Sequence, residues 1–244
     1  MTTSAPVARG KPAAFGQEIL RRRMRLTLQR VNLTGLRVLD FGCGNGAQTL
    51  AFQNGPACMV ALDICREDLD SLLEMLGQQG TTTIAPVLYD GRHLPLRSHS
   101  IDRVLSYEVL EHVEDESTAL RELHRVMKPG AEGVLTVPNK WWLFETHGTT
   151  LPLLPWHRIP FLSWLPHPLH RRIARARIYT RASLHRLLTE HRFAVRELRY
   201  VTAPMDAVSI PWLQRVLRRT VFAPDQTRIP LLATAILAHF SKPS

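Results

Sequence analysis

The fold is decided by the stretch Val38-Leu39-Asp40-Phe41-Gly42-Cys43-Gly44-Asn45-Gly46. It closes an apolar run, residues 36–41, that predicts a buried strand. Three alternating glycines follow, and glycine adopts backbone conformations denied to other residues and lets a ligand approach the backbone closely. The stretch therefore predicts a strand, a glycine-rich turn that binds a ligand, and then a helix that runs through Leu50.

Strands and helices alternate on both sides of this turn. Apolar runs predict strands at 36–41, 59–64, 82–89, 103–107, 133–137, 193–201 and 231–240. Helical spacing of apolar residues predicts helices at 15–31, 67–76, 117–127, 181–191 and 211–219. Such alternation implies right-handed crossovers, so we expect an α/β fold with a doubly wound, mainly parallel sheet.

One domain accounts for most of the chain. The 244 residues are 45% hydrophobic and 21% charged, an ordinary globular composition that excludes a disordered chain or a coiled coil. We expect a flexible tail at residues 1–14 and a single domain at residues 15–244. Two irregular segments, 139–180 and 205–228, are expected near the carboxyl ends of the strands, where open α/β sheets bind ligands. We interpret them as lid insertions over the site, on the side where an acceptor substrate would bind.

The sequence contains no signal for export or for a membrane span. No run approaches the roughly 18 uncharged apolar residues of a membrane-spanning helix, and the N-terminus has no apolar signal core. The three cysteines, Cys43, Cys58 and Cys65, form no C-x-x-C pair. We therefore expect a cytoplasmic protein.

Positive charge is concentrated in the second part of the chain. Residues 1–139 carry 15 Lys or Arg and 16 Asp or Glu, a net −1, whereas residues 140–244 carry 16 and 5, a net +11. All five tryptophans also lie in the second part. This asymmetry predicts an anionic partner surface, either nucleic acid or lipid headgroups.

Two acidic residues end the strands that follow the glycine turn. Asp63 ends the second expected strand, 21 residues after Gly42, where an acid can accept from both hydroxyls of a ribose. Asp90 ends the third expected strand, and its carboxylate could accept from an exocyclic adenine amine. Both acids predict a ligand that contains a nucleoside.

With these residues, the sequence resembles the class I S-adenosylmethionine-dependent methyltransferases, in particular the type 11 group with the ubiquinone- and menaquinone-biosynthesis enzymes. The resemblance covers residues 30–138 densely, through 38–46, Asp63, Asp90 with Leu94-Pro95, 106–113 and 120–130 in that order. It implies S-adenosylmethionine as cofactor and a seven-stranded Rossmann-like sheet whose last strand is antiparallel. It also implies a set of cofactor-binding residues: Asp40, near the methionine amino group, Gly42, Cys43, Gly44, Gly46, Asp63, Ile64, Asp90, Gly91, Ser106 and Tyr107.

A dinucleotide is the rival cofactor. Residues 42–47 also satisfy the looser G-x-G-x-x-A form of a dinucleotide fingerprint, with an acid about 20 residues on. A dehydrogenase, however, requires neither Asp40 before the turn nor Lys128-Pro129-Gly130 near the end of the matched region. Both residue sets favour the methyltransferase interpretation.

The segment Glu108-Val109-Leu110-Glu111-His112 concentrates ionisable groups. If a helix begins there, two carboxylates and an imidazole share one face and could hold a divalent cation. The same E-x-x-E-H occurs in ubiquinone-biosynthesis O-methyltransferases and small-RNA 2′-O-methyltransferases, where it resembles a metal site. Much of the wider family carries the segment without a metal, so we assign no metal ligand. Glu108, His112 and His147 are the candidate catalytic residues, of which a base is needed only when the acceptor must lose a proton.

The acceptor is less sharply indicated. Tryptophans interleaved with arginines in residues 139–180 are compatible with lipid headgroups, with single-stranded nucleic acid, or with a packed lid whose basic face is solvated. The apolar, proline-rich content of this segment favours lipid over RNA. We expect a methyltransferase for a small hydrophobic or lipid-like acceptor, methylated at oxygen or carbon, in peripheral contact with the anionic inner face of a membrane. The alternatives are an RNA methyltransferase and a catalytically silent cofactor-binding scaffold; the oligomeric state is left open.

Overall fold

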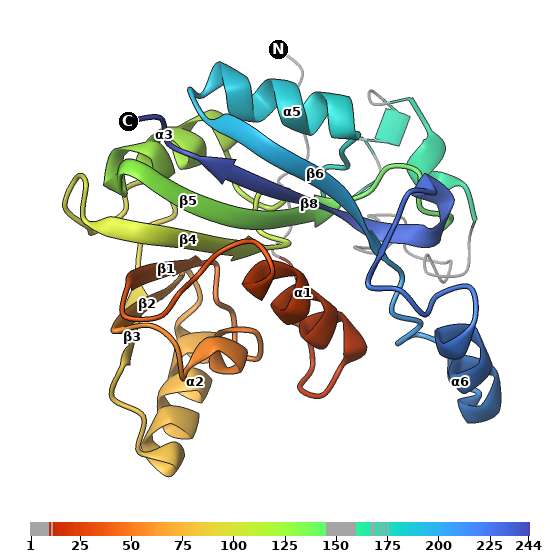
Figure 1. Cartoon of the computed structure of the whole chain (residues 1–244), viewed down its shortest axis with the longest axis horizontal. Coiled ribbons are helices and arrows are strands. Elements are labelled where there is room, and N and C mark those ends of the chain that lie inside the picture. The colour runs from red at the N-terminus through yellow and green to blue at the C-terminus, as the bar shows by residue number, and fades with distance from the viewer. Residues whose placement is uncertain are drawn as a thin grey trace.

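One sheet carries the strands of the described part of the chain in the computed structural model (Figure 1). The structure describes residues 10, 12–144, 160–166, 169, 170, 172, 174 and 176–244. The strands are β1 (Arg37–Phe41), β2 (Cys58–Asp63), β3 (Ile84–Leu88), β4 (Ile101–Tyr107), β5 (Met127–Pro138), β6 (Ala194–Thr202), β7 (Gln226–Thr227) and β8 (Ala233–Ser241). They lie in the order β3-β2-β1-β4-β5-β8-β6-β7.

The first five strands are parallel, and antiparallel pairing begins at β8. β1 pairs with β2 and β4, β2 with β3, and β4 with β5, all in parallel. β8 is antiparallel to both of its neighbours, β5 and β6. The predicted α/β sheet with an antiparallel last strand is confirmed, and the two-residue β7 adds an eighth strand beside β6.

Helices cover both faces of the sheet (Figure 1). The covering helices are α1 (Glu18–Leu28), α2 (Arg66–Gln79), α3 (Glu116–Val126) and α5 (Arg181–Glu190), whereas α6 (Pro211–Arg219) has no buried residue. One hydrophobic core contains leucines of α3 and α5, and the other contains leucines of α1 and α2. Because both faces are covered, β1 is buried at every residue after Arg37 instead of alternating. No described helix is long and apolar enough to cross a membrane.

The order of the strands in the sheet reverses at β1. β2 and β3 lie on one side of β1, and β4 and β5 lie on the other. In open α/β sheets the crevice at such a switch point, outside the carboxyl ends of the strands, is where ligands bind. The ends of β1 and β4 therefore define where a site is expected.

Two local features of the helices differ from what the sequence suggests. The turn after β1 leads into a single 3-10 segment, Thr49–Phe52, instead of an α-helix through Leu50. Residues 108–114 form turns and bends, and α3 begins only at Glu116. The carboxylate of Asp115 caps that helix by accepting from the backbone N–H groups of Ser117 and Thr118, which fixes where it starts.

Candidate functional site

A cavity of about 1170 Å³ lies at the carboxyl ends of β1, β2 and β4. Asp40, Asp63 and Tyr107 come from the ends of these three strands and line it. Ordinary small-molecule pockets measure about 300–1,000 Å³. The cavity therefore has room for a cofactor and a second small molecule together.

The glycine turn supplies one wall of the cavity. Gly42 has a φ of +77°, and a Cβ at this position would overlap the side chain of Val109. Gly46, with a φ of +80°, packs in the same way against Leu72 of α2 and does not line the cavity. Gly42, Cys43 and Gly44 thus present the turn to the cavity, whereas Gly46 shapes the turn from behind. Ser106, another expected contact, is buried in β4 and is also absent from the lining.

Asp63 is held by the backbone of both neighbouring loops. Its Oδ2 accepts from the N–H of Gly44 at 2.7 Å and its Oδ1 from the N–H of Cys65 at 3.0 Å. Each carboxylate oxygen has two lone pairs, so both can accept a second hydrogen bond from a ligand. The side chain is therefore preorganised as a two-point acceptor at the edge of the glycine turn.

Asp40 is a buried carboxyl beneath the same turn. It accepts from Thr49 Oγ1 at 2.7 Å, in the 3-10 segment. Burial, reinforced by the negative charge of Asp63, raises the pKa of Asp40 to about 7, although the Thr49 bond opposes the shift. A carboxylate in such a place gains from a cationic ligand that compensates its lost hydration.

Asp90 lies in an exposed turn at the cavity rim, with Gly91 and Ile64 beside it in the lining. Its Oδ1 accepts from the backbone N–H groups of His93 and Arg92, both at 2.8 Å. These donors hold the pKa of Asp90 below its usual range. Oδ2 accepts neither of these bonds and is the oxygen that can receive a donor from a ligand.

Glu108 follows β4 in a strained backbone conformation. Its φ is +58°, which is uncommon for a residue other than glycine. Its carboxylate lies 3.1 Å from Arg23 Nη2, and the Arg23 guanidinium lies 5.9 Å from the centre of the Tyr107 ring. All three residues line the cavity. Strain of this kind persists where the surroundings enforce it, often at functional sites.

His112 also lines the cavity, with its side chain 11% exposed. A Cβ on Gly10 would lie 2.7 Å from His112 Nε2, so Gly10 lies directly against the imidazole. The premise that Glu108, Glu111 and His112 share a helix face is wrong, because they occupy a turn. In the described residues no group of three or more His, Cys, Asp or Glu could hold a metal ion. His147 lies outside the described residues.

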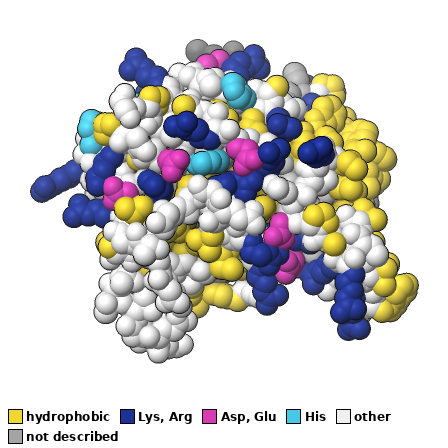
Figure 2. Space-filling model, viewed as in Figure 1, with side chains coloured by type: hydrophobic (Ala, Val, Ile, Leu, Met, Phe, Trp, Pro, Cys, Tyr) yellow, Lys and Arg dark blue, Asp and Glu magenta, His cyan; other side chains and the backbone are white. Residues whose placement is uncertain are grey.

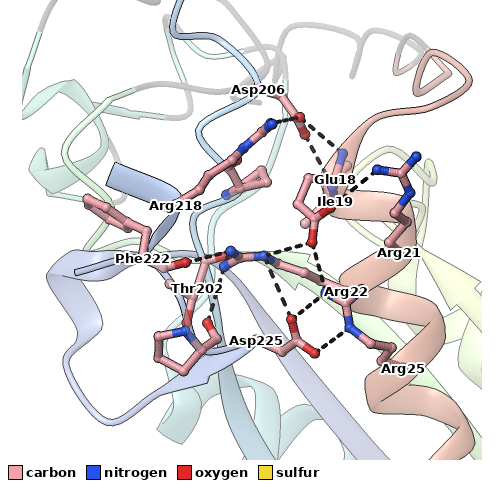
Figure 3. A network of polar contacts seen from close by, with 12 residues as sticks. Glu18, Ile19, Arg21, Arg22, Arg25, Thr202, Asp206, Arg218, Phe222 and Asp225 are labelled. Atoms are coloured by element: carbon pink, nitrogen blue, oxygen red, sulfur yellow. Dashed lines mark hydrogen bonds and ion pairs between the residues drawn. The ribbon is translucent and has the colours of Figure 1, made fainter. Parts of the chain in front are cut away.

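A polar network joins α1 to the chain after β6 (Figure 3). Asp206 accepts from the backbone N–H groups of Glu18 and Ile19, at 3.0 and 3.2 Å, and from Arg218 Nη2 at 2.6 Å. It therefore caps the N-terminus of α1 from a distant part of the chain. Arg22 is buried in the same network, and its guanidinium donates to the backbone carbonyls of Thr202, Ala203, Phe222 and Pro224.

The network brings apolar segments to the far wall of the cavity. Lining side chains there come from the start of α1, the end of β6 with its following loop, and the chain after β5. They are Ile19, Leu20, Trp142, Phe144, Ala203, Pro204, Met205, Ala207 and Val208. Residues from both expected lid segments thus line the cavity, and these segments also contribute the charged side chains of Arg177 and Asp206.

The cavity residues that sequence reasoning missed include Arg23, Gly10 and Pro12. Arg23 is buried in α1 on the same side as Leu20 and Thr27, its i−3 and i+4 neighbours. An arginine within the apolar stripe of a helix was the available signal. Gly10 and Pro12, which lie in the expected tail, had no comparable signal, because their contacts are with His112 and Gly44, distant in sequence.

Comparisons with known proteins agree with this geometry. Residues 39–135 match the model of a family described as a methyltransferase domain. Methyltransferase GfsG of Streptomyces halstedii is 33% identical over 99 residues, which cover 39% of this chain and 35% of that protein. A ubiquinone biosynthesis O-methyltransferase of Pseudomonas aeruginosa is 30% identical over 132 residues, 52% of this chain and 57% of that protein.

A solved structure shares the fold over most of the chain. The S-adenosylmethionine-dependent methyltransferase of Mesorhizobium loti has a TM-score of 0.61 and covers 91% of this chain and 97% of its own, at 21% identity. The matches to the two curated relatives span only 35% and 57% of their lengths. The family match at residues 39–135 contains the glycine turn, Asp63, Asp90 and the segment 108–112, and it favours a methyltransferase over a dehydrogenase.

Proposed function

We propose that this chain, whose residues 39–135 are a class I S-adenosylmethionine-dependent methyltransferase domain, methylates a small hydrophobic or lipid-like acceptor at oxygen or carbon. One observation carries the proposal: the lining of a single cavity joins the glycine turn and its acids to apolar side chains from α1, from the loop after β6 and from the chain after β5. A cavity of about 1170 Å³ accommodates both reactants at once. The name of the Pseudomonas relative supports oxygen as the methylated atom.

The cofactor side fits S-adenosylmethionine group by group. The backbone of Gly42, Cys43 and Gly44 would lie against the cofactor, since a Cβ at Gly42 has no room. Asp63 would accept from the two ribose hydroxyls, because both of its oxygens are already oriented by backbone donors. Asp40 would face the methionine ammonium, the cation that a buried carboxylate favours.

The remaining contacts are to the adenine. Asp90 would accept from its exocyclic amine, with Ile64 and Gly91 beside the ring. Gly46 and Ser106 would act through the shape of the turn and of β4, since neither lines the cavity.

When bound, the cofactor would supply a methyl group on a sulfonium, activated for transfer to an acceptor atom as the carbon–sulfur bond breaks. The chain's part is alignment and exclusion of water. For a hydroxyl acceptor, His112 would take the proton, because its imidazole lines the cavity and a neutral imidazole can act as a general base. Glu108, in contact with Arg23, would position that guanidinium rather than accept a proton. His147 remains a candidate base.

The acceptor side favours an apolar molecule. Trp142, Phe144, Met205 and Val208 line it, and burial of an apolar acceptor against such side chains yields about 25 cal/mol for each Å² removed from water. A nucleic acid would bring phosphates, for which this wall offers few donors. The net +11 of residues 140–244 nevertheless keeps RNA as the second candidate.

Transfer of labelled methyl from the cofactor into an extract of the source cells tests the proposal. The extract is then separated into organic, nucleic-acid and protein fractions, with the Asp63→Ala variant as the control for enzyme-dependent label. Label in the organic fraction supports a lipid-like acceptor. Label in nuclease-sensitive material makes RNA the substrate, and cofactor binding with no label in any fraction supports the scaffold alternative.

A further inference from the structure

The helix α6 turns a side with both apolar and basic residues outward. None of its residues is buried, and Trp212 and Val216 are 66% and 49% exposed. With 3.6 residues per turn, positions 212, 215, 216 and 219 fall on one side of the helix and are exposed, whereas 213, 214, 217 and 218 fall on the other side and are half-buried. In Figure 1 α6 projects beside the sheet instead of lying on it.

The half-buried side of α6 is held to the body by Gln214 and Arg218. Gln214 Nε2 donates to the carbonyls of Met205 and Val208, at 2.9 and 3.2 Å. Arg218 donates to the carbonyl of Pro204 at 2.8 Å and to Asp206 at 2.6 Å. Leu213 and Leu217 are half-buried on this side, so the apolar residues of α6 are divided between the body and the solvent. These bonds hold Trp212 and Val216 in the solvent.

The exposed surface around α6 combines apolar and basic side chains. Ile210 and Val221, at its two ends, are 46% and 54% exposed. Arg215 and Arg219 are exposed, and residues 207–224 contain no Asp or Glu. Figure 2 shows hydrophobic side chains at the outer margin of the region of α6, with Lys or Arg side chains beside them.

We propose that this surface, formed by Ile210, Trp212, Arg215, Val216, Arg219 and Val221, docks on an anionic lipid bilayer. An interfacial helix has this composition, with Trp and aliphatic residues for the acyl boundary and arginines for the headgroups. Charge complementarity selects the occupant. Two copies of the surface packed together would face arginine against arginine with no carboxylate from residues 207–224 between them.

The docking surface is connected to the cavity by a short path. Met205, Asp206 and Val208 line the cavity, and the same three residues receive the bonds that hold α6. A docked α6 therefore brings the apolar wall of the cavity next to the bilayer, so that a lipid-like acceptor enters without crossing water. This last step rests on the proposed function, whereas the docking itself does not.

Co-sedimentation with vesicles tests the docking. One set of vesicles is phosphatidylcholine alone, and the other has about a third of its lipid as phosphatidylglycerol. The double variant Trp212→Ser, Val216→Ser should bind the anionic vesicles at least about tenfold more weakly, because it loses the apolar area that inserts. The control is Leu73→Ser on α2, which removes an equally exposed leucine, 52% exposed, and should bind as the wild type does.

Charge variants distinguish the insertion of apolar side chains from the electrostatic attraction to anionic headgroups. Arg215→Gln and Arg219→Gln should each weaken binding to anionic vesicles about fivefold and leave binding to neutral vesicles unchanged. The wild type should retain part of its binding at high salt, because insertion of Trp212 does not depend on salt. Equal binding of the Trp212→Ser, Val216→Ser variant and the wild type would overturn the proposal. So would a concentration-dependent dimer that this variant abolishes, or binding only to RNA.

Failure of the docking and failure of the proposed function are distinguishable. The vesicle assay needs neither cofactor nor turnover. Methyl transfer to a detergent-dispersed extract of apolar metabolites should be the same in the Trp212→Ser, Val216→Ser variant and in the wild type, since neither residue lines the cavity. Transfer to the same acceptors embedded in anionic vesicles should fall at least about tenfold in the variant, in step with its binding.

Discussion

The cofactor side and the acceptor side of the cavity are built in different ways. On the cofactor side, Asp40, the glycine turn and Asp63 come from two adjacent strands, and backbone groups fix them: Gly44 donates to Asp63, and Gly42 packs on Val109. On the acceptor side, the start of α1 and the loop after β6 are joined by side chains nearly 190 residues apart, such as Asp206 to the N–H of Glu18.

This difference has a functional consequence. A wall made of backbone in a fixed turn tolerates almost no substitution, so it suits a cofactor whose shape does not vary. A wall made of side chains from separate segments can change its residues without disturbing the sheet. Substitutions in the backbone wall should therefore cause large losses of cofactor affinity. Substitutions in the side-chain wall should change acceptor preference by modest factors.

The sharpest failure is expected at Gly42. Gly42→Ala forces a left-handed φ of +77° on alanine and an overlap with Val109. Each penalty is worth about 1–3 kcal/mol, so cofactor affinity should fall about a hundredfold or more, measured by calorimetric titration.

The control for this variant is Gly77→Ala in α2, where a Cβ meets nothing within 4 Å. It should leave affinity unchanged and raise the free energy of unfolding by about 0.8–1.0 kcal/mol, since alanine favours the helix. Unchanged cofactor affinity in Gly42→Ala would mean that the turn does not contact the cofactor.

The next largest effect should come from Asp40. Its pKa of about 7 in the folded protein means that the carboxylate becomes protonated as the pH falls below 7. Affinity for the cationic cofactor should then fall by up to about tenfold per pH unit. Asp40→Asn should bind about ten- to a hundredfold more weakly at pH 8, as expected for a lost charged hydrogen bond, and should show no such pH dependence.

The stability of the folded protein should change with pH in the opposite direction to cofactor affinity. The folded pKa of Asp40 is raised from 3.8 to about 7, so the folded state holds the proton more tightly and its stability declines as the pH rises from about 4 to 7. The shift of roughly three units corresponds to about 4 kcal/mol. In urea unfolding at pH 8, Asp40→Asn should be more stable than the wild type. Equal free energies of unfolding for the two proteins at pH 8 would mean that the pKa of Asp40 is not raised.

A smaller and different effect is expected on the acceptor side. Asp206→Ala removes the cap of α1 and the anchor of Arg218, which should cost about 1–2 kcal/mol of stability. The KM for the acceptor should rise about three- to tenfold because the apolar wall loosens. Asp70→Ala, an exposed acid of α2, is the matched control and should change neither quantity. If Asp206→Ala lowered the affinity for the cofactor more than the affinity for the acceptor, the two sides of the cavity would not have the separate roles described above.

The same contrast explains what was predictable from the sequence. Asp40, Gly42 and Asp63 lie in contiguous motifs at strand ends, so strand prediction places them at one edge of the sheet. The order of parallel strands follows from the alternation of elements. Arg23 and Gly10 contact Glu108 and His112 through the tertiary fold, and no local pattern encodes such contacts.

Backbone bonding to the neighbouring strand explains why no helix begins at residues 108–112. The segment has helical spacing of its ionisable groups, but Glu108 is held at a φ of +58°, with its N–H bonded to the carbonyl of Thr136 in β5. That bond extends the β4–β5 edge past the strand and turns the chain before a helix can begin. The N-cap at Asp115 then starts α3 seven residues later.

Calorimetric titration of S-adenosylmethionine into the wild type, Asp63→Ala and Asp206→Ala tests the central claim most directly. Asp63→Ala loses a two-point acceptor, with each lost charged hydrogen bond worth about 1.5–3 kcal/mol, so its affinity should fall at least about thirtyfold. Asp206→Ala should bind within about threefold of the wild type, because its contacts are on the other wall. If Asp63→Ala binds the cofactor as tightly as the wild type does, the assignment of the glycine-turn side to the cofactor is wrong.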